Sequence, residues 1–545
     1  MYQKRILMQK LSDLYPTEAQ IPAQWQITEP IHQKHYLVNG ELRVWNGESE
    51  TVKSPIYVQT EAGLKQKIVG SFPLISAEAA METLNAASKA YDYGRGEWPT
   101  MTVEERIRCV EAFTKIMLGF REYVIKMLMW EIGKNLADSA KEFDRTVQYI
   151  NDTVEALKKI DREGSQFTIS EGVIGQMRRS PLGVVLCMGP FNYPLNETFT
   201  LLIPALIMGN TVVYKVPRQG TLLNEPFLKA FAECFPKGVI NIIYGQGRVV
   251  VPPMMSSGKV DVLTLIGSSK MADNLRKLHP KTNRLRAVFG LDAKNAGIVL
   301  ASADLDLAAQ ECMLGALSYN GQRCTALKIL FVHSSVQDVF IQKLNDCIAK
   351  LKIGMPWDNG VNITPVAEPE KPEYHRMCIA EALANGAAIM NEGGGNIDHS
   401  FVAPTVLFPI NDKMKNYHEE QFGPVIPIVP FSDISEPVEY IIQSEYGQQV
   451  SIFGQDAAQI AQLVDPLTNQ VCRVNINSQC QRGPDVFPFT GRKDSAERTL
   501  SIHHALTAFS LNTMVAAKAT DANKAILNDI IKNNDSNFIS TRFIF

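Results

Sequence analysis

The stretch GVVLCMGPFNYPLNETFTLLIPALIMGNTVVYKV, residues 183–216, decides the fold of this chain. It opens and closes with short, continuous apolar runs, and a segment long enough for a helix separates them. Similar runs follow at residues 238–245, 260–267 and 284–290, again with helical segments between them. Continuous apolar strands that alternate with helices are typical of a parallel sheet that is covered on both faces. The stretch therefore predicts an α/β fold.

The same alternation starts a second time further along the chain. Apolar runs at residues 297–300, 327–333 and 425–431 are separated by segments with helical spacing. Two successive sets of this kind predict two α/β domains that meet near residues 290–297. Residues 76–160 precede both sets, and their apolar side chains at helical spacing predict helices.

The composition argues against several classes of protein. The 545 residues include 54 Lys and Arg and 57 Asp and Glu, and the formal charge of -3 disfavours a nucleic-acid binder or a polybasic membrane-surface protein. No apolar run is long enough to span a bilayer, and the N-terminus lacks the apolar core of a signal peptide. The nine cysteines are scattered without a CxxC pair, which favours reduced thiols. We therefore expect a cytoplasmic protein that binds no metal, nucleic acid or membrane.

Cys324 is the first candidate for a reactive group. It lies in YNGQRCTALKILFVH, residues 319–333, between a predicted helix and a predicted strand. A turn that contains Gly321 exposes the thiol, and the guanidinium of Arg323 favours the thiolate. Any one of nine cysteines is more often a buried structural residue, so this interpretation depends on the polar residues that accompany it.

Polar residues follow several of the predicted strands. Asn192 lies in PFNYP after the first strand, and Lys215 lies at the end of the second. Gly267 and Ser268 follow the fourth strand, where a helix N-terminus can bind a pyrophosphate. Open α/β sheets bind ligands at the carboxyl ends of their strands, so these positions favour a nucleotide site. The alternatives stay open, because Asn192 can instead cap a helix and no GxGxxG motif is present.

Taken together, these residues resemble the aldehyde dehydrogenase superfamily. The resemblance extends over about residues 70–515. The motifs that carry it are PLGVVLCMGPFNYP (181–194), VVYKVPRQG (212–220), GQRCTALK (321–328), EEQFGPVIPI (419–428) and FPFTGRKDS (487–495). The segments FNYP, GQRCTA and NSQCQRGPDVFPF are similar to the branch of non-phosphorylating, NADP-dependent glyceraldehyde-3-phosphate dehydrogenases.

The resemblance implies an aldehyde dehydrogenase-like α/β fold in three parts. A Rossmann-type cofactor-binding domain would take residues 1–292, interrupted by an oligomerisation arm at about 158–182. An α/β catalytic domain would take residues 293–500, and residues 501–545 would supply a further strand of the small β arm and a tail. An arm with unpaired strand edges needs a partner, so we expect a homodimer or a homotetramer.

The resemblance also implies the catalytic chemistry. Cys324 would attack the aldehyde carbon, and Asn192 with the backbone N–H of Cys324 would form the oxyanion hole. Loss of a hydride to NADP would leave a thioester on the cysteine. The residues implied at a substrate phosphate are Arg145, Tyr193, Arg323 and Arg482, since converging guanidinium groups bind a dianion well.

The implied cofactor site draws on four segments. Lys215 would hold the adenosine ribose or its phosphate, Glu420 the nicotinamide ribose, and Phe422 would back the ring. Gly267 and Ser268 would bind the pyrophosphate.

Arg218 bears on the choice of cofactor. NAD-preferring members often carry Glu at the matching position, where it accepts the ribose hydroxyls. A guanidinium there complements a 2′-phosphate instead, which favours NADP.

The sequence departs from the resemblance at the general base. The hydrolytic members use a Glu to activate water, and the matching residue here is Gly290. A general base typically contributes about 10² to 10⁴-fold to a rate. Three functions stay open: oxidation of a phosphorylated or other anionic aldehyde, such as glyceraldehyde 3-phosphate, with Asp292 or another carboxylate as the base; an acylating enzyme that uses coenzyme A; or a degenerate paralogue without turnover.

Overall fold

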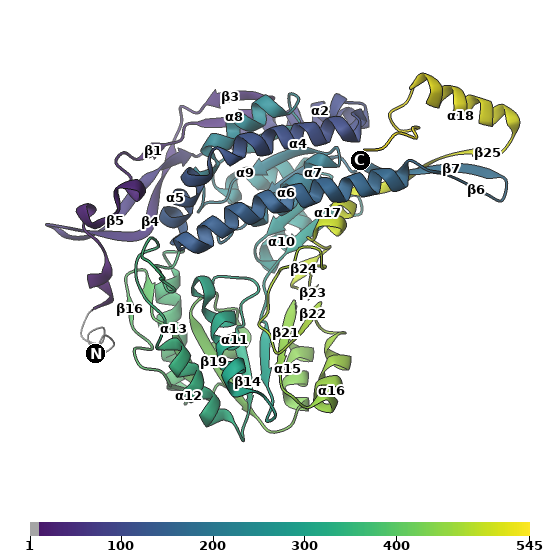
Figure 1. Cartoon of the computed structure of the whole chain (residues 1–545). Helices are drawn as coiled ribbons and strands as arrows, with labels where there is room; N and C mark the ends of the chain where they lie inside the picture. Colours follow the sequence, from purple (N-terminus) through teal and green to yellow (C-terminus); the bar gives the residue numbers. More distant parts are fainter. Residues whose placement is uncertain (1–9, 545) are drawn as a thin grey trace.

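The molecule has two α/β halves and a projecting arm (Figure 1). The computed structural model describes residues 10–544. In the first half an eight-stranded sheet has the order β24-β12-β11-β8-β9-β10-β2-β3. Its strands are β2 (His35–Val38), β3 (Glu41–Val44), β8 (Val184–Met188), β9 (Thr211–Lys215), β10 (Ile240–Ile243), β11 (Val262–Ile266), β12 (Arg286–Gly290) and β24 (Ala496–Glu497).

The five central strands of this sheet are parallel, as the apolar runs predict. Every residue of β8 and of β10 is buried, because helices cover both faces of the sheet. The helices around this sheet are α2 (Ala77–Tyr91), α3 (Glu97–Thr100), α4 (Val103–Leu118), α5 (Arg121–Ile132), α6 (Leu136–Gly164), α7 (Asn196–Ile207), α8 (Glu225–Cys234), α9 (Gly247–Ser256) and α10 (Ser269–Leu278).

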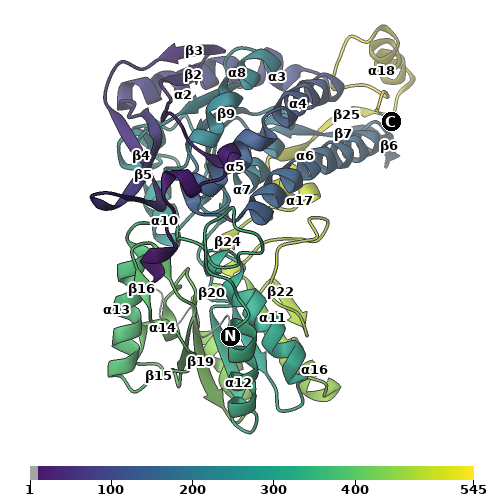
Figure 2. The same ribbon diagram turned by 60° about the vertical axis from the view of Figure 1, so that its left-hand side comes forward.

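A seven-stranded sheet forms the second half, with the order β15-β18-β19-β14-β13-β21-β22. Its strands are β13 (Ala296–Val299), β14 (Ile329–His333), β15 (Ala388–Ile389), β18 (Thr405–Phe408), β19 (Val425–Phe431), β21 (Gln449–Phe453) and β22 (Arg473–Ile476). Its helices are α11 (Leu305–Leu317), α12 (Gln337–Ile348), α13 (Lys371–Ala384), α14 (Lys415–His418), α15 (Ser435–Gln443) and α16 (Ala457–Leu467). Figure 2 shows this half below the first.

The chain crosses between the halves more than once. Strand β24 follows the second half in sequence but pairs antiparallel with β12 of the first sheet. The short strands β16 (Ile397–Asp398), β17 (Phe401–Val402), β20 (Tyr446–Gly447) and β23 (Arg492–Lys493) complete the second half. A boundary drawn at residue 500 therefore leaves one strand of the first sheet in the second domain.

The arm is a three-stranded antiparallel sheet beyond the end of α6 (Figure 1). Its strands are β6 (Phe167–Ser170), β7 (Val173–Pro181) and β25 (Ser510–Lys518). Helix α17 (Ile502–Ala508) precedes β25, so the strand begins later than residue 501. Helix α18 (Asp521–Asn533) follows, and the tail after it returns to the arm, where Gln176 Nε2 donates to Ser540 O at 2.6 Å.

The N-terminal part adds a small sheet of β1 (Ile31–His32), β4 (Ser49–Thr60) and β5 (Gly63–Pro73). It brings Glu50 of β4 to the edge of the first half. None of the helices within residues 10–544 is long and apolar enough to cross a membrane. All nine cysteines are free thiols. The described residues hold no group of three or more His, Cys, Asp or Glu side chains that suits a metal ion.

Candidate active site

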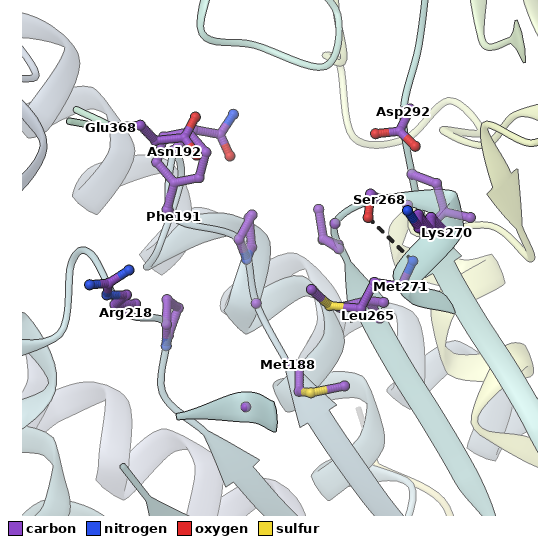
Figure 3. A pocket seen from close by; sticks show the side chains of 18 of the residues that line it. Met188, Phe191, Asn192, Arg218, Leu265, Ser268, Lys270, Met271, Asp292 and Glu368 are labelled. Carbon is purple, nitrogen blue, oxygen red and sulfur yellow. Dashed lines mark hydrogen bonds between the residues drawn. The ribbon is translucent and has the colours of Figure 1, made fainter. Parts of the chain in front are cut away.

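A cleft of about 1140 Å³ lies where the carboxyl ends of the first sheet face the second half of the chain. The first sheet contributes the ends of β8, β9, β11 and β12, and the second half contributes Cys324, Glu420 and Phe422. Figure 3 shows the side chains that line it. The sequence places polar residues at these strand ends, and the structure brings them to a single cleft, as expected for an open α/β sheet.

Cys324 lies partly exposed on a tight turn after α11. The turn needs Gly321, whose φ is +71° and where a Cβ would lie 2.5 Å from Gly423 O. The carbonyl of Cys324 accepts from Asn295 Nδ2 at 2.8 Å and from Lys328 Nζ at 2.9 Å. These bonds fix the backbone that carries the thiol.

Opposing influences act on the Cys324 thiol. Burial raises its pKa above the ordinary value for cysteine, and the positive charge of Lys328 acts in the other direction. The negative charge of Glu420 raises the pKa further, while a hydrogen bond with Gln448 lowers it. The thiol therefore depends on its neighbours for ionisation, as an activated nucleophile does.

Asn192 is held so that its amide faces this turn. Its Nδ2 donates to Gln322 O at 2.8 Å, two residues before Cys324. An amide nitrogen carries two hydrogens, so a second one is available to a substrate oxygen. This arrangement suits an oxyanion donor.

A buried ion pair that the sequence does not reveal supports the Asn192 loop. Lys134 Nζ donates to Asn192 O at 2.7 Å and pairs with Glu142, and both side chains are fully buried. Glu142 Oε1 in turn accepts from the backbone N of Leu195 at 3.1 Å. Lys134 precedes α6 and Glu142 lies in its second turn, in a polar sequence that gives no local signal of a burial site.

The predicted cofactor residues Lys215, Gly267 and Ser268 line the same cleft. Burial lowers the pKa of Lys215 to about 8, so its ammonium is stabilised by an anion. Ser268 caps α10 by accepting from Met271 N at 3.3 Å, and Gly267 precedes it. A partly buried lysine and a helix N-terminus can both bind phosphates, so these residues fit a dinucleotide.

Arg218 lines the cleft together with Glu50, which is its ion-pair partner. Its Nε lies 2.8 Å from Glu50 Oε1, and its side chain is 72% exposed. The exposed guanidinium keeps its remaining donors, so it fits a 2′-phosphate. Glu50 is a second residue of this cleft that the sequence analysis did not find, because it comes from β4, far away in the chain.

Asp292 lines the cleft beside the start of α10. Its Oδ2 accepts from Ser269 N at 2.7 Å and from Ser269 Oγ at 2.9 Å. Figure 3 shows it across the cleft from Asn192. The hypothesis that Asp292 is the first candidate for a substitute base is therefore disfavoured, because its carboxylate is bound to a helix start away from the oxyanion donor.

Glu420 and Phe422 line the cleft. Lys328 Nζ lies 2.5 Å from Glu420 Oε1, which also accepts from Ala293 N at 3.3 Å. The ring of Phe422 packs against that of Phe191 at 5.8 Å. Both predicted residues thus line the cleft that Lys215 and Cys324 also line.

The predicted phosphate-binding residues are grouped but lie outside the lining of this cleft. Burial raises the pKa of Tyr193, and the charges of Arg323 and Arg145 act in the opposite direction, so these three are neighbours. Burial lowers the pKa of Arg482 to about 10, and the charge of Arg145 adds to this effect.

Two carboxylates accompany these guanidinium groups. Arg145 makes a two-pronged contact with Asp485, with N–O distances of 3.1 and 2.8 Å. Arg482 pairs with Glu197 and lies 3.4 Å from Asp485. Arg323 donates to the backbone oxygen of Gly315 at 2.8 Å. A phosphate would therefore have to compete with Asp485 and Glu197, which the sequence analysis did not foresee.

Gly290 ends β12 and lines the cleft. Because glycine has no side chain, residue 290 supplies no carboxylate to the site. A Cβ there would meet only side-chain atoms, Ile266 Cγ1 at 3.3 Å and Leu500 Cδ1 at 3.4 Å. Nothing in the backbone requires glycine at this position.

The chain belongs to the aldehyde dehydrogenase family, whose model matches residues 50–515. This finding and the similar solved structures confirm the predicted family and the predicted fold. The chain is 32% identical over 472 residues to the NADP-dependent glyceraldehyde-3-phosphate dehydrogenase of Streptococcus equinus, covering 85% of this chain and 96% of that protein. It is 28% identical to the 3-sulfolactaldehyde dehydrogenase of Priestia aryabhattai, covering 70% of this chain and 80% of that protein.

This chain is also similar to a solved structure. The NADP-dependent glyceraldehyde-3-phosphate dehydrogenase of Bacillus halodurans C-125, complexed with NADP, matches with a TM-score of 0.81 at 30% identity. The match covers 90% of this chain and 100% of the chain from Bacillus halodurans.

Proposed function

We propose that this aldehyde dehydrogenase oxidises an anionic aldehyde with NADP, through a thioester on Cys324. The observation that carries the proposal is the shared cleft, whose lining includes Cys324, Asn192 and Lys215. The similar proteins from Streptococcus equinus and Bacillus halodurans are both named as NADP-dependent, which supports NADP as the cofactor.

The chemistry follows from the residues at the Cys324 end. The thiolate of Cys324 attacks the aldehyde carbon, and the resulting oxyanion accepts hydrogen bonds from Asn192 Nδ2 and from the backbone N–H of Cys324. Bound NADP supplies the hydride acceptor. Loss of the hydride leaves a thioester on Cys324, and Lys328 stabilises the thiolate at the start and at the end of the cycle.

The positive charge of the guanidinium groups near Cys324 supports an anionic substrate. Three guanidinium groups, of Arg145, Arg323 and Arg482, accompany the two carboxylates of Glu197 and Asp485. The net charge of the group is positive, and guanidinium groups bind phosphate and sulfonate oxygens in pairs. Glyceraldehyde 3-phosphate is one such aldehyde. The similarity to a 3-sulfolactaldehyde dehydrogenase supports the wider class of anionic aldehydes.

The test is a comparison of substrates with the purified full-length chain and NADP. Glyceraldehyde 3-phosphate, a sulfonated aldehyde and uncharged aldehydes are followed by NADPH absorbance, in the first turnover and in the steady state. We expect the anionic aldehydes to have the higher kcat/KM. Equal values for charged and uncharged aldehydes would contradict an anionic substrate, and no NADPH with any aldehyde would favour the degenerate paralogue.

Coenzyme A separates hydrolysis from acyl transfer. If water is the acceptor, coenzyme A leaves the steady rate unchanged and the product is the free acid. A steady rate that requires coenzyme A, with a thioester as the product, would favour the acylating alternative.

We further propose that the chain works in the cytoplasm as a homodimer or homotetramer built through the arm. Large apolar side chains on the arm are exposed: Ile169, Val173, Met177, Leu511 and Met514. Apolar surface of this kind is stabilised when a second subunit covers it. Light scattering of the purified chain measures the assembly directly, and a monomer at micromolar concentration would contradict it.

A further inference from the structure

Six carboxylates line the active-site cleft in the described part of the chain, and five of them have close partners. The five are Glu50 with Arg218, Glu197 with Arg482, Asp292 with Ser269, Glu419 with the Tyr374 hydroxyl, and Glu420 with Lys328. Glu368 is the sixth. Within residues 10–544 its carboxylate accepts no hydrogen bond, and the nearest cation is Lys371 Nζ at 3.9 Å. Both of its oxygens are therefore without a hydrogen-bond donor among the described residues and are available to a water molecule.

The backbone ties Glu368 to the oxyanion donor. Ala367 N, directly before Glu368, donates to Gln322 Oε1 at 3.0 Å. The backbone oxygen of the same Gln322 accepts from Asn192 Nδ2 at 2.8 Å. Gln322 thus links the segment that carries Glu368 to Asn192, and it stands two residues before Cys324. Figure 3 shows the Glu368 side chain next to Asn192.

The surroundings of Glu368 suit proton transfer. Burial raises its pKa above the ordinary value for glutamate, and the charge of Lys371 acts in the other direction. The negative charges of Glu370 and Glu420 raise the pKa further. A carboxylate with a raised pKa is a stronger base, while its 21% exposure leaves room for water.

We propose that Glu368 is the general base for hydrolysis of the thioester on Cys324. Its carboxylate removes a proton from a water molecule, and the water oxygen bonds to the acyl carbon. The tetrahedral oxyanion accepts from Asn192 Nδ2 and the Cys324 N–H. Collapse breaks the carbon–sulfur bond, the acid leaves, and the proton on Glu368 returns to the sulfur or to solvent. No oxidant or reductant takes part in this step.

The inference rests on the proposed thioester, and p-nitrophenyl acetate tests both without NADP. The ester acylates a thiol directly, so the nitrophenolate burst reports acylation and the steady rate reports deacylation. The variants are Glu368→Gln and, as the matched control, Glu370→Gln, which changes an exposed carboxylate two residues away. Cys324→Ala tests the nucleophile itself.

We expect Glu368→Gln to keep a burst near one equivalent and to slow deacylation by about 10² to 10⁴-fold. Hydroxylamine, which needs no base to attack a thioester, should restore the rate. The pH profile of deacylation should lose its acid limb in Glu368→Gln. Glu370→Gln should keep the limb and move it only slightly to lower pH, because it removes a charge that raises the pKa of Glu368.

Deacylation of Glu368→Gln at the parental rate, with the acid limb intact, would overturn the inference. So would an equal loss of burst and steady rate that hydroxylamine does not repair, because that result indicates a structural role. A burst that survives in Cys324→Ala contradicts the thioester itself, so failure of the proposed function is distinguishable from failure of the role of Glu368.

Discussion

The ammonium of Lys328 lies 2.5 Å from the carboxylate of Glu420 and donates to the backbone oxygen of Cys324 at 2.9 Å. One cation thus pairs with the Glu420 carboxylate and stabilises the thiolate of Cys324. Lys328 is 2% exposed, so solvent screens these interactions weakly.

Lys328→Met should shift acylation to higher pH. The pKa of Cys324 is already raised by burial, and loss of the cation raises it further, so less thiolate is present at neutral pH. Lys328→Arg keeps the charge and should keep most of the profile. The rate of the first turnover is measured from pH 6 to 10, and profiles that coincide for Lys328→Met and the parent would contradict this role. Loss of one partner of a buried pair also costs about 3–5 kcal/mol, which a melting curve checks.

Cys324→Ala should abolish the NADPH burst and leave NADP binding close to normal. The matched control is Cys480→Ala, because Cys480 is fully buried and burial raises its pKa to about 11. Burst amplitude in a stopped-flow instrument and cofactor binding by fluorescence are the measurements. If Cys480→Ala loses the burst and Cys324→Ala keeps it, the assignment of the nucleophile is wrong.

NADP should bind more tightly than NAD, and Arg218→Glu should narrow or reverse this difference. A guanidinium stabilises a 2′-phosphate, and a carboxylate repels it. Glu50→Gln removes the carboxylate that lies 2.8 Å from Arg218, so it should strengthen NADP binding more than NAD binding. Dissociation constants of both cofactors are measured by calorimetry. Equal constants in the parent would contradict the role of Arg218.

Arg145→Gln should raise KM for an anionic aldehyde by one to two orders of magnitude, about 1.5–3 kcal/mol for a charged hydrogen bond. An uncharged aldehyde should change little. Arg145 is the better site to vary. Removal of the buried Arg482 would leave the Glu197 carboxylate without its ion-pair partner and would destabilise the fold. Arg121→Gln is the control, since Arg121 forms an exposed pair with Asp144 on the neighbouring helices. A similar loss with both substrates would indicate damage to the fold or the cofactor site.

Gly290→Glu should raise the steady rate without raising the burst. A side chain at this position meets Ile266 and Leu500 side-chain atoms and no backbone atom, so the fold should accept it after small shifts. The gain should be larger in a Glu368→Gln background, where the proposed base is absent. Burst and steady phases are recorded with NADP and the best anionic aldehyde. A variant that folds, forms NADPH in the burst and gains nothing in the steady phase would show that position 290 cannot supply the base.

Local sequence patterns determined the fold and the positions of the main candidate residues. The apolar runs predict β8, β9, β10 and β11, since a strand buried on both faces must be apolar along its length. Once these strands are placed, Asn192, Lys215 and Ser268 must lie at one edge of the sheet. The Thr102 and Glu105 pair likewise predicts the start of α4, where the structure has a capping box.

The arm and the tail were predicted less completely. Helix α17 occupies the first residues of the expected strand. Helix α18 was not foreseen, although Ile526, Leu527, Ile530 and Ile531 recur at helical spacing in its sequence. Strand β24 has two residues, which is too short for an alternating pattern to be visible.

Only the tertiary structure decided which charges meet. Arg218 and Glu50 are 168 residues apart, and Lys134 meets the oxygen of Asn192 at a separation of 58 residues. Periodicity records whether a side chain faces the core, but it holds no information about which distant segment comes to lie beside it. For the same reason, the sequence predicts Asp292 as a candidate base from its position two residues after Gly290. Glu368 can be proposed only from the folded structure, in which its segment is linked to Asn192 through Gln322.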